Sequence, residues 1–198
     1  MEIIRIPLGV YQTNCYLVKS DKQVIIIDPG TKSERIISKI AEDEKVLAIF
    51  LTHGHFDHIG AVDDLVKHYQ VSVYAHANER EIYTNPMYNY AQNQKTKINS
   101  KVIDLDDFYK MGPFDIEVIE SFGHSPGSVM FKIHNELFTG DTLFKNGVGR
   151  TDLYKSSEQA LKKSLKLIKL MPSYLNIYPG HEDVSTLAEE LKNNPHLQ

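Results

Sequence analysis

Residues 52–58 of this 198-residue chain have the sequence Thr-His-Gly-His-Phe-Asp-His, and they directly follow a wholly apolar run. His53 and His55 are two positions apart, so on an extended segment their side chains point the same way and can reach one ion. Asp57 and His58 come after the chain turns and can reach a neighbouring position. Imidazole and carboxylate are ligands that suit zinc, iron and manganese. The segment therefore predicts a metal site at the end of a strand.

The apolar run before this segment, residues 46–51, predicts a strand that is buried on both faces. Thr31 and Glu34 fit a capping box at the start of a helix that we expect to run to about Glu44. A second helix is expected over residues 59–69. Further strands are predicted over residues 2–8, 14–19, 24–27 and 71–75. This alternation of strands and helices is typical of an α/β layered fold.

The second half of the chain is richer in strands, which are predicted over residues 114–120, 128–134, 136–140 and 174–178. The second and third of these form a hairpin. A long amphipathic helix is expected over residues 157–171, with Ser156 and Gln159 as its caps, and a final helix lies near the C-terminus. Two sheet-rich halves, each ending in helices, predict one domain over residues 1–198, built as a sandwich of two sheets with helices outside.

Three further candidate ligands also follow predicted strands. His124, Asp141 and His181 each come directly after a glycine, which lets backbone approach closely. A lone histidine at such a place is an ordinary loop residue. Three strand-end ligands in addition to the first cluster instead predict one shared site, because α/β sheets place their sites at the carboxyl ends of strands.

Composition narrows the function classes. The chain has 22 basic and 26 acidic residues, a net charge of -4, and no basic cluster of the kind that binds nucleic acid. No apolar run is long enough to span a bilayer, so no membrane association is expected. The single cysteine excludes an intrachain disulfide. Because the first residues lack the features of a signal peptide, we expect a cytoplasmic protein.

With these ligands in place, the chain resembles the metallo-β-lactamase superfamily, and within it the glyoxalase II-like (hydroxyacylglutathione hydrolase-like) thioester hydrolases. The resemblance covers nearly the whole chain. It is carried by HxHxDH at residues 53–58, Gln-Thr-Asn-Cys-Tyr at 12–16, Asp-Pro-Gly at 28–30 and Tyr-Pro-Gly-His at 178–181. It implies an α/β fold, the four-layer αββα sandwich, with metals at one edge.

The same resemblance implies two divalent metal ions, with zinc expected and iron or manganese as alternatives. It assigns the first ion to His53, His55 and His124, the second to Asp57, His58 and His181, and a bridging position to Asp141.

The resemblance also implies a mechanism. Two such ions can share a hydroxide that exists at neutral pH, and this hydroxide would attack the carbonyl of a small-molecule thioester. Asp57 is expected to act as a ligand, with general base as its alternative role, and Asp28 and Thr52 are candidates to orient the imidazoles.

The same residues are compatible with other functions. A persulfide dioxygenase with a single iron shares HxHxDH and a Gly-Arg-Thr-Asp segment like that at residues 149–152. A lactonase, a phosphodiesterase or a binding module without catalysis are further alternatives. We expect no β-lactamase, because we expect that branch to lack the counterpart of His58 and to place a cysteine where Asp141 stands.

Two features of the sequence predict substrate-binding residues. Arg150 is expected either to grip a substrate carboxylate or to form a buried salt bridge with Asp152. The polar, aromatic stretch over residues 83–100 predicts a loop near the mouth of the site, where Tyr88 and Tyr90 would shape the pocket. The chain lacks the C-terminal helical domain of glyoxalase II proper, so we expect little selectivity for glutathione.

Overall fold

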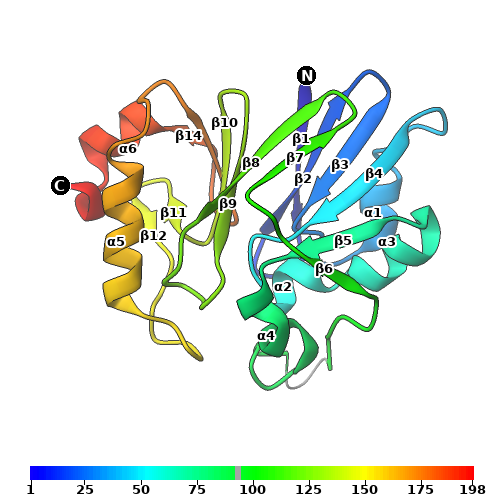
Figure 1. The fold of residues 1–198 in the computed structure, drawn as a ribbon, viewed down its shortest axis with the longest axis horizontal. Coiled ribbons are helices and arrows are strands. Elements are labelled where there is room, and N and C mark those ends of the chain that lie inside the picture. The colour runs from blue at the N-terminus through cyan, green and yellow to red at the C-terminus, as the bar shows by residue number, and fades with distance from the viewer. Residues whose placement is uncertain (92–94) are drawn as a thin grey trace.

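The computed structural model describes residues 1–91 and 95–198, which form four layers, with two sheets inside and helices outside (Figure 1). The first sheet has its strands in chain order, antiparallel from β1 to β3 and parallel from β3 to β6. These strands are β1 (Glu2–Leu8), β2 (Thr13–Ser20), β3 (Gln23–Ile27), β4 (Lys45–Phe50), β5 (Ser72–Ala75) and β6 (Val102–Asp104). Its helical elements are α1 (Ser33–Ile37), α2 (Phe56–Ile59), α3 (Val62–Tyr69), the 3-10 turn η1 (Ala77–Glu79) and α4 (Arg80–Thr84).

The second sheet is antiparallel except for the parallel pair β10 and β13. In spatial order its strands are β14 (Ser185–Thr186), β13 (Asn176–Pro179), β10 (Glu136–Gly140), β9 (Val129–Ile133), β8 (Phe114–Glu120) and β7 (Phe108–Met111). A short hairpin of β11 (Leu143–Phe144) and β12 (Gly147–Val148) precedes the helical elements α5 (Glu158–Ile168), α6 (Leu187–Asn193) and η2 (Pro195–Leu197).

Apolar side chains fill the space between each pair of layers. Between the sheets, the rings of Phe50 and Phe131 meet edge to face with centroids 5.4 Å apart. On the outer face of the first sheet, Leu65 of α3 is buried in an aliphatic cluster. On the outer face of the second, Leu161 and Leu165 of α5 are buried because they share one face of that helix. The expected four-layer sandwich is therefore confirmed, with one core between the sheets and one under each helical layer.

The two sheets also contact each other through backbone at the edge where the strand ends meet. The amide of Val129 donates to the carbonyl of Thr52 at 2.9 Å, and the amide of Asn14 donates to the carbonyl of Gly180 at 2.7 Å. Each bond joins a segment of one sheet to a segment of the other. Loops that follow β3, β4, β8, β10 and β13 are thereby held together at this edge.

The helices are shorter than the sequence patterns predict. The helix expected over residues 31–44 is only α1, and Thr31 does not cap it, because Lys32 in the left-handed conformation (φ 58°) precedes its first turn. The helix expected over residues 59–69 is divided into α2 and α3, since the amide of Ala61 donates to the carbonyl of Pro29 instead of continuing α2.

In α5 the cap is Ser157 rather than Ser156, since the hydroxyl of Ser157 accepts from the amide of Ala160. The strand expected over residues 174–178 begins later, at Asn176. The strands β6, β7, β11, β12 and β14 were not anticipated, because runs of two to four residues carry too little periodicity to stand out. Among the described residues, every helix is too short or too polar to span a bilayer.

Candidate metal centre

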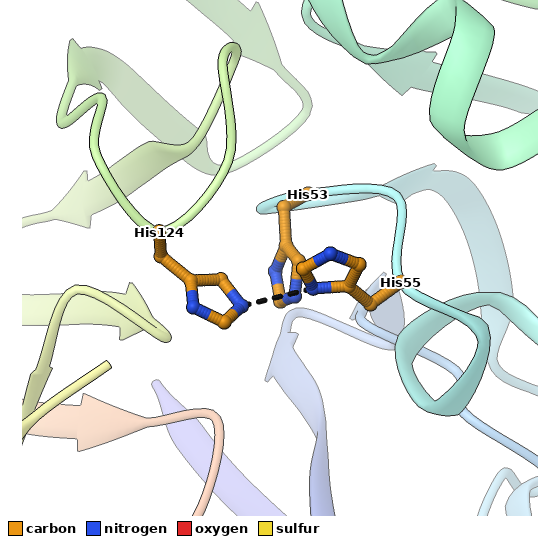
Figure 2. A group of neighbouring side chains, drawn as sticks. All are labelled: His53, His55 and His124. Atoms are coloured by element: carbon orange, nitrogen blue, oxygen red, sulfur yellow. Dashed lines mark hydrogen bonds between the residues drawn. The ribbon is translucent and has the colours of Figure 1, made fainter. Parts of the chain in front are cut away.

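Six of the seven sequence-predicted ligands form two groups at the shared edge of the sheets. In each group the candidate ligand atoms all lie within 4.8 Å of one another. Figure 2 shows the first group, where the imidazoles come from the loops after β4 and β8 and converge on one point. The groups are His53, His55 and His124, and Asp57, His58 and His181.

Asp141, the seventh candidate, lies between the two groups. Its Oδ2 is 3.4 Å from Nε2 of His124 in the first group, and its Oδ1 is 3.4 Å from Nε2 of His58 in the second. Its Oδ2 is also 3.5 Å from Nε2 of His181. One carboxylate at the end of β10 therefore faces both groups, as a bridging ligand requires.

The spacing of these atoms suits metal ions better than hydrogen bonds. Nitrogen and oxygen ligands bind zinc at about 2.0–2.2 Å, so two ligands on one tetrahedral ion are about 3.4 Å apart. The Oδ2 atom of Asp57 lies 3.3 Å from Nε2 of His181 and 3.6 Å from Nε2 of His58. These distances match that separation and are long for charge-assisted hydrogen bonds.

Several buried atoms of the centre have no hydrogen-bond partner among the described residues. They are Nε2 of His53, His55 and His58, and Oδ1 of Asp141. His55 is set apart from the other three, because the nitrogen that this ring presents to His124 is Nδ1. Buried polar atoms in folded proteins are nearly always satisfied, so a group of orphans pointing into one site requires an explanation. Imidazole nitrogen and carboxylate oxygen are the donors that divalent transition metals take, and the residues fit two such ions.

Hydrogen bonds behind the imidazoles fix which ring nitrogen carries the proton. Thr52 Oγ1 donates to Asp28 Oδ2 at 2.6 Å, so it must accept from Nδ1 of His53 at 3.0 Å. Nδ1 of His58 donates to the same Asp28 oxygen at 2.9 Å. In both rings Nδ1 is therefore occupied, and Nε2 is the nitrogen left to bind an ion at the centre. The prediction that Asp28 and Thr52 orient the imidazoles is confirmed.

Backbone carbonyls accept the Nδ1 proton of two other histidines and so fix their tautomers. Nδ1 of His124 donates to the carbonyl of Arg150 at 3.0 Å, and Nδ1 of His181 donates to that of Tyr11 at 3.1 Å. His55 is reversed, since its Nδ1 lies 2.9 Å from Nε2 of His124. For His55 to bind an ion through Nδ1, its proton must be on Nε2.

The histidine pKa values of the two groups are shifted in opposite directions. Burial, reinforced by the charge of His58, lowers the pKa of His53 well below its ordinary value. Burial also lowers the pKa of His55 to about 3 and lowers the pKa of His124. At neutral pH the first group therefore consists of neutral imidazoles, the form that binds metal.

The second group behaves in the opposite way. Burial lowers the pKa of His58, but Asp57, Asp141 and Asp28 outweigh it and raise that pKa to about 9. Burial is likewise outweighed at His181, where Asp141 and Asp57 raise the pKa to about 11. Burial raises the pKa of Asp57, and the charge of His58, the proximity of His181 and the hydrogen bond from Thr13 bring it down to about 2. These carboxylates favour cations in the second group.

The start of β2 supports the second group, a role that the sequence analysis did not assign. Thr13 Oγ1 donates to Asp57 Oδ2 at 2.7 Å. The Asn14 amide group and the Tyr16 hydroxyl donate to the carbonyl of Pro179 at 3.0 and 2.6 Å, which fixes the turn that carries His181. The polar side chains of residues 12–14, at the start of an otherwise apolar strand, were the available signal.

Glycine is required where this turn passes the bridging carboxylate. A Cβ added at Gly180 would lie 2.2 Å from Oδ1 of Asp141 and 2.8 Å from Cε1 of His58. No side chain fits there without displacing a candidate ligand.

A cavity of about 510 Å³ opens over the centre and is lined by His55, Asp57, His124, Asp141 and His181. This volume is in the range of small-molecule sites. Tyr90 and Arg150 also line it. Tyr88 does not, since its ring is stacked on Tyr154 with centroids 3.9 Å apart. The loop near the mouth is thus confirmed for its residues 89 and 90, whereas residues 92–94 of that stretch lie outside the described residues.

The Arg150 side chain makes a paired contact with Asp152 at 2.6 and 2.7 Å. The expected partner is correct, but the expected burial is wrong, because the two side chains are 64% and 69% exposed. Exposed pairs are worth little, so Arg150 can exchange this partner for another carboxylate.

Sequence reasoning missed Glu79. This carboxylate at the end of η1 is fully buried and accepts from the backbone amide of Gly54 at 2.7 Å. The available signal was its position three and four residues before Ile82 and Tyr83, both buried, since an acidic residue on the apolar face of a helix needs hydrogen-bond donors.

Comparison with known proteins agrees with this geometry. The chain is 33% identical to the hydroxyacylglutathione hydrolase GloC of Haemophilus influenzae, over 100% of this chain and 98% of GloC. It is similar to the crystal structure of the BLEG-1 B3 metallo-beta-lactamase, with a TM-score of 0.94, 34% identity and all of both chains covered. It is also similar to TTHA1623 in a di-iron-bound form, with a TM-score of 0.87, 34% identity and 97% and 98% of the two chains covered.

The BLEG-1 match does not support our expectation that the β-lactamase branch is excluded, because a chain so named is similar over its full length. The family model described as Metallo-beta-lactamase superfamily matches residues 8–181, which include both candidate groups and Asp141. The chain belongs to the metallo-beta-lactamase superfamily.

Proposed function

We propose that this chain is a binuclear metal-dependent hydrolase that cleaves small-molecule thioesters. The observation that carries the proposal is the position of Asp141, whose two oxygens each lie 3.4 Å from a histidine of a different group. A carboxylate so placed suits a pair of ions rather than a single one.

His53, His55 and His124 would hold one ion, and Asp57, His58 and His181 the other, with Asp141 shared. When bound, a pair of divalent ions supplies a hydroxide nucleophile at neutral pH and polarises a carbonyl. The residues of the chain orient this chemistry. Asp28 and Thr52 keep two histidines in the correct tautomer, and Thr13 holds Asp57 through one oxygen.

Asp57 is better suited to the role of ligand than to that of general base. Its Oδ2 is 3.3 Å from His181 and 3.6 Å from His58, and it accepts from Thr13. The surrounding cations hold its pKa at about 2, so it is a poor proton acceptor near neutral pH.

Thioesters are proposed as the substrate class because GloC, similar over its full length, is named a hydroxyacylglutathione hydrolase. This chain covers 98% of GloC, so the lack of a C-terminal helical domain no longer argues against a glutathione thioester as the substrate. In the cavity, Arg150 is the cation that can bind a carboxylate of the substrate, and Tyr90 forms an aromatic wall beside His55.

We propose zinc as the metal in both positions, because histidine-rich centres of this kind bind zinc well. The di-iron form of TTHA1623 makes iron the alternative to be tested. Metal analysis of protein purified without chelator is expected to give two ions per chain.

The decisive experiment replaces the metal. Metal-free protein loaded with zinc is assayed without oxygen on thioesters of glutathione and of other thiols, a lactone, a phosphodiester and a β-lactam. The same protein loaded with iron is then given a persulfide while oxygen uptake is recorded. Because zinc has no redox chemistry, thioester cleavage by the zinc form without oxygen supports the hydrolase.

The other outcomes each name a different enzyme. Oxygen uptake by the iron form together with an inert zinc form would replace the proposal by a dioxygenase. A kcat/KM for the lactone, phosphodiester or β-lactam far above that for every thioester would keep the hydrolase and overturn the substrate class.

A further inference from the structure

Glu79 lies beneath the two loops that carry the first group of candidate ligands. It ends η1, directly before α4, and its side chain is fully buried. Glu79 lies 26 residues after His53 in the sequence, so only the fold brings it to the loops that carry the ligands.

Its carboxylate joins those two loops. Oε2 accepts from the amide of Gly54, between His53 and His55, at 2.7 Å. Oε1 accepts from Oγ of Ser125, the residue after His124, at 2.6 Å and from the amide of Gly127 at 2.7 Å. One side chain therefore ties the loop after β4 to the loop after β8.

The arrangement is costly for the fold. Within the residues that the structure describes, no lysine, arginine or histidine forms an ion pair with Glu79, so hydrogen bonds alone offset the loss of hydration of a carboxylate. Glu79 makes no contact of this kind with the second group, whose supports are Asp28, Thr13 and the carbonyl of Tyr11.

We propose that Glu79 is a positioning residue that sets the separation of His55 and His124 and thereby selectively strengthens binding of the first ion. The proposal rests on the metal binding in the proposed function and not on the reaction. Residues that orient metal ligands typically contribute 10- to 100-fold in affinity, so a change confined to Glu79 is expected to weaken one ion by about that factor.

The test is Glu79→Gln. Whichever way the new amide turns, its NH2 group faces the N–H of Gly54 or that of Gly127, so one loop loses its acceptor. Glu190→Gln is the matched control. Glu190 is also buried and accepts from a backbone amide, that of Asn146, and from the hydroxyl of Ser185, but it lies in α6 away from the centre.

Zinc affinity is measured by competition with a chromophoric chelator, and metal content by elemental analysis. We expect Glu79→Gln to weaken one of the two ions about 10- to 100-fold and leave the other unchanged. Glu190→Gln is expected to lower the Tm and leave both affinities at the wild-type values. If Glu79→Gln is too unstable to purify, Ser125→Ala removes only one of the three donors and is expected to weaken the same ion by a smaller factor.

Combination with ligand variants identifies which ion is affected. In a His124→Ala background the first group is already broken, so Glu79→Gln should cause no further loss of the remaining ion. In a His181→Ala background it should weaken the remaining ion. Two ions held with wild-type affinity in Glu79→Gln would overturn the inference, as would equal weakening of both. Fewer than two ions in the wild-type protein would instead overturn the proposed centre.

Discussion

Asp28→Asn replaces one carboxylate oxygen with an NH2 group. The carboxylate of Asp28 fixes the tautomer of one histidine in each group, His53 through Thr52 and His58 directly. In the structure, Oδ1 of Asp28 accepts from the amide of Thr52 at 2.8 Å, while Oδ2 accepts from Thr52 Oγ1 and from His58 Nδ1. If the asparagine NH2 replaces Oδ2, it donates where the carboxylate accepted. His58 must then carry its proton on Nε2, and the Thr52 hydroxyl turns to donate to His53, which moves that proton as well.

The magnitude follows from these bonds. Each wrongly protonated ligand is expected to weaken its ion about 10- to 100-fold, or about 1.4–2.8 kcal/mol. Because His53 is in the first group and His58 in the second, both ions are affected. If the asparagine instead turns its NH2 toward the Thr52 amide, that buried N–H is orphaned, and stability falls by about 1–3 kcal/mol.

Chelator competition measures the two affinities, urea denaturation measures the stability, and long-range proton–nitrogen NMR shows which imidazole nitrogen is protonated. Asp63→Asn is the control, since Asp63 accepts from the amides of Asn99 and Ser100 and touches no candidate ligand. Wild-type affinities together with a stability no lower than that of the control would refute the reasoning.

Three further predictions concern the centre itself. Asp141→Ala should weaken both ions and abolish hydrolysis, because its oxygens face both groups; elemental analysis and kcat would check this, and unchanged turnover would remove it from the bridge. His58 and His181, with pKa values of about 9 and 11, must lose protons to bind an ion, so affinity for the second ion should fall as pH is lowered from about 9 to 6. Calorimetry in buffers of different ionisation enthalpy should detect the released protons, and an affinity that does not change with pH would contradict the assignment. Gly180→Ala should displace Asp141 and lower metal content, whereas Gly147→Ala, whose added Cβ meets only a side chain at 3.9 Å, should behave as wild type.

The sequence determined the elements that are long and strongly patterned. The wholly apolar run before residues 52–58 is β4, and the apolar stripe of Leu161, Leu165 and Ile168 is α5. Such patterns are local, because one buried face imposes its period on the residues that form it. Helix ends were less predictable, since Lys32 and Ala61 adopt conformations set by the loops they join.

For the site, the sequence supplied the donors, and the superfamily resemblance supplied their division into two groups. What only the tertiary structure decided is how distant segments meet. It placed Asp141 between the groups, turned Tyr88 onto Tyr154 while leaving Tyr90 in the cavity, and put Glu79 under both ligand loops. These contacts depend on the packing of two sheets against each other, and no local period in the sequence records which residues that packing brings together.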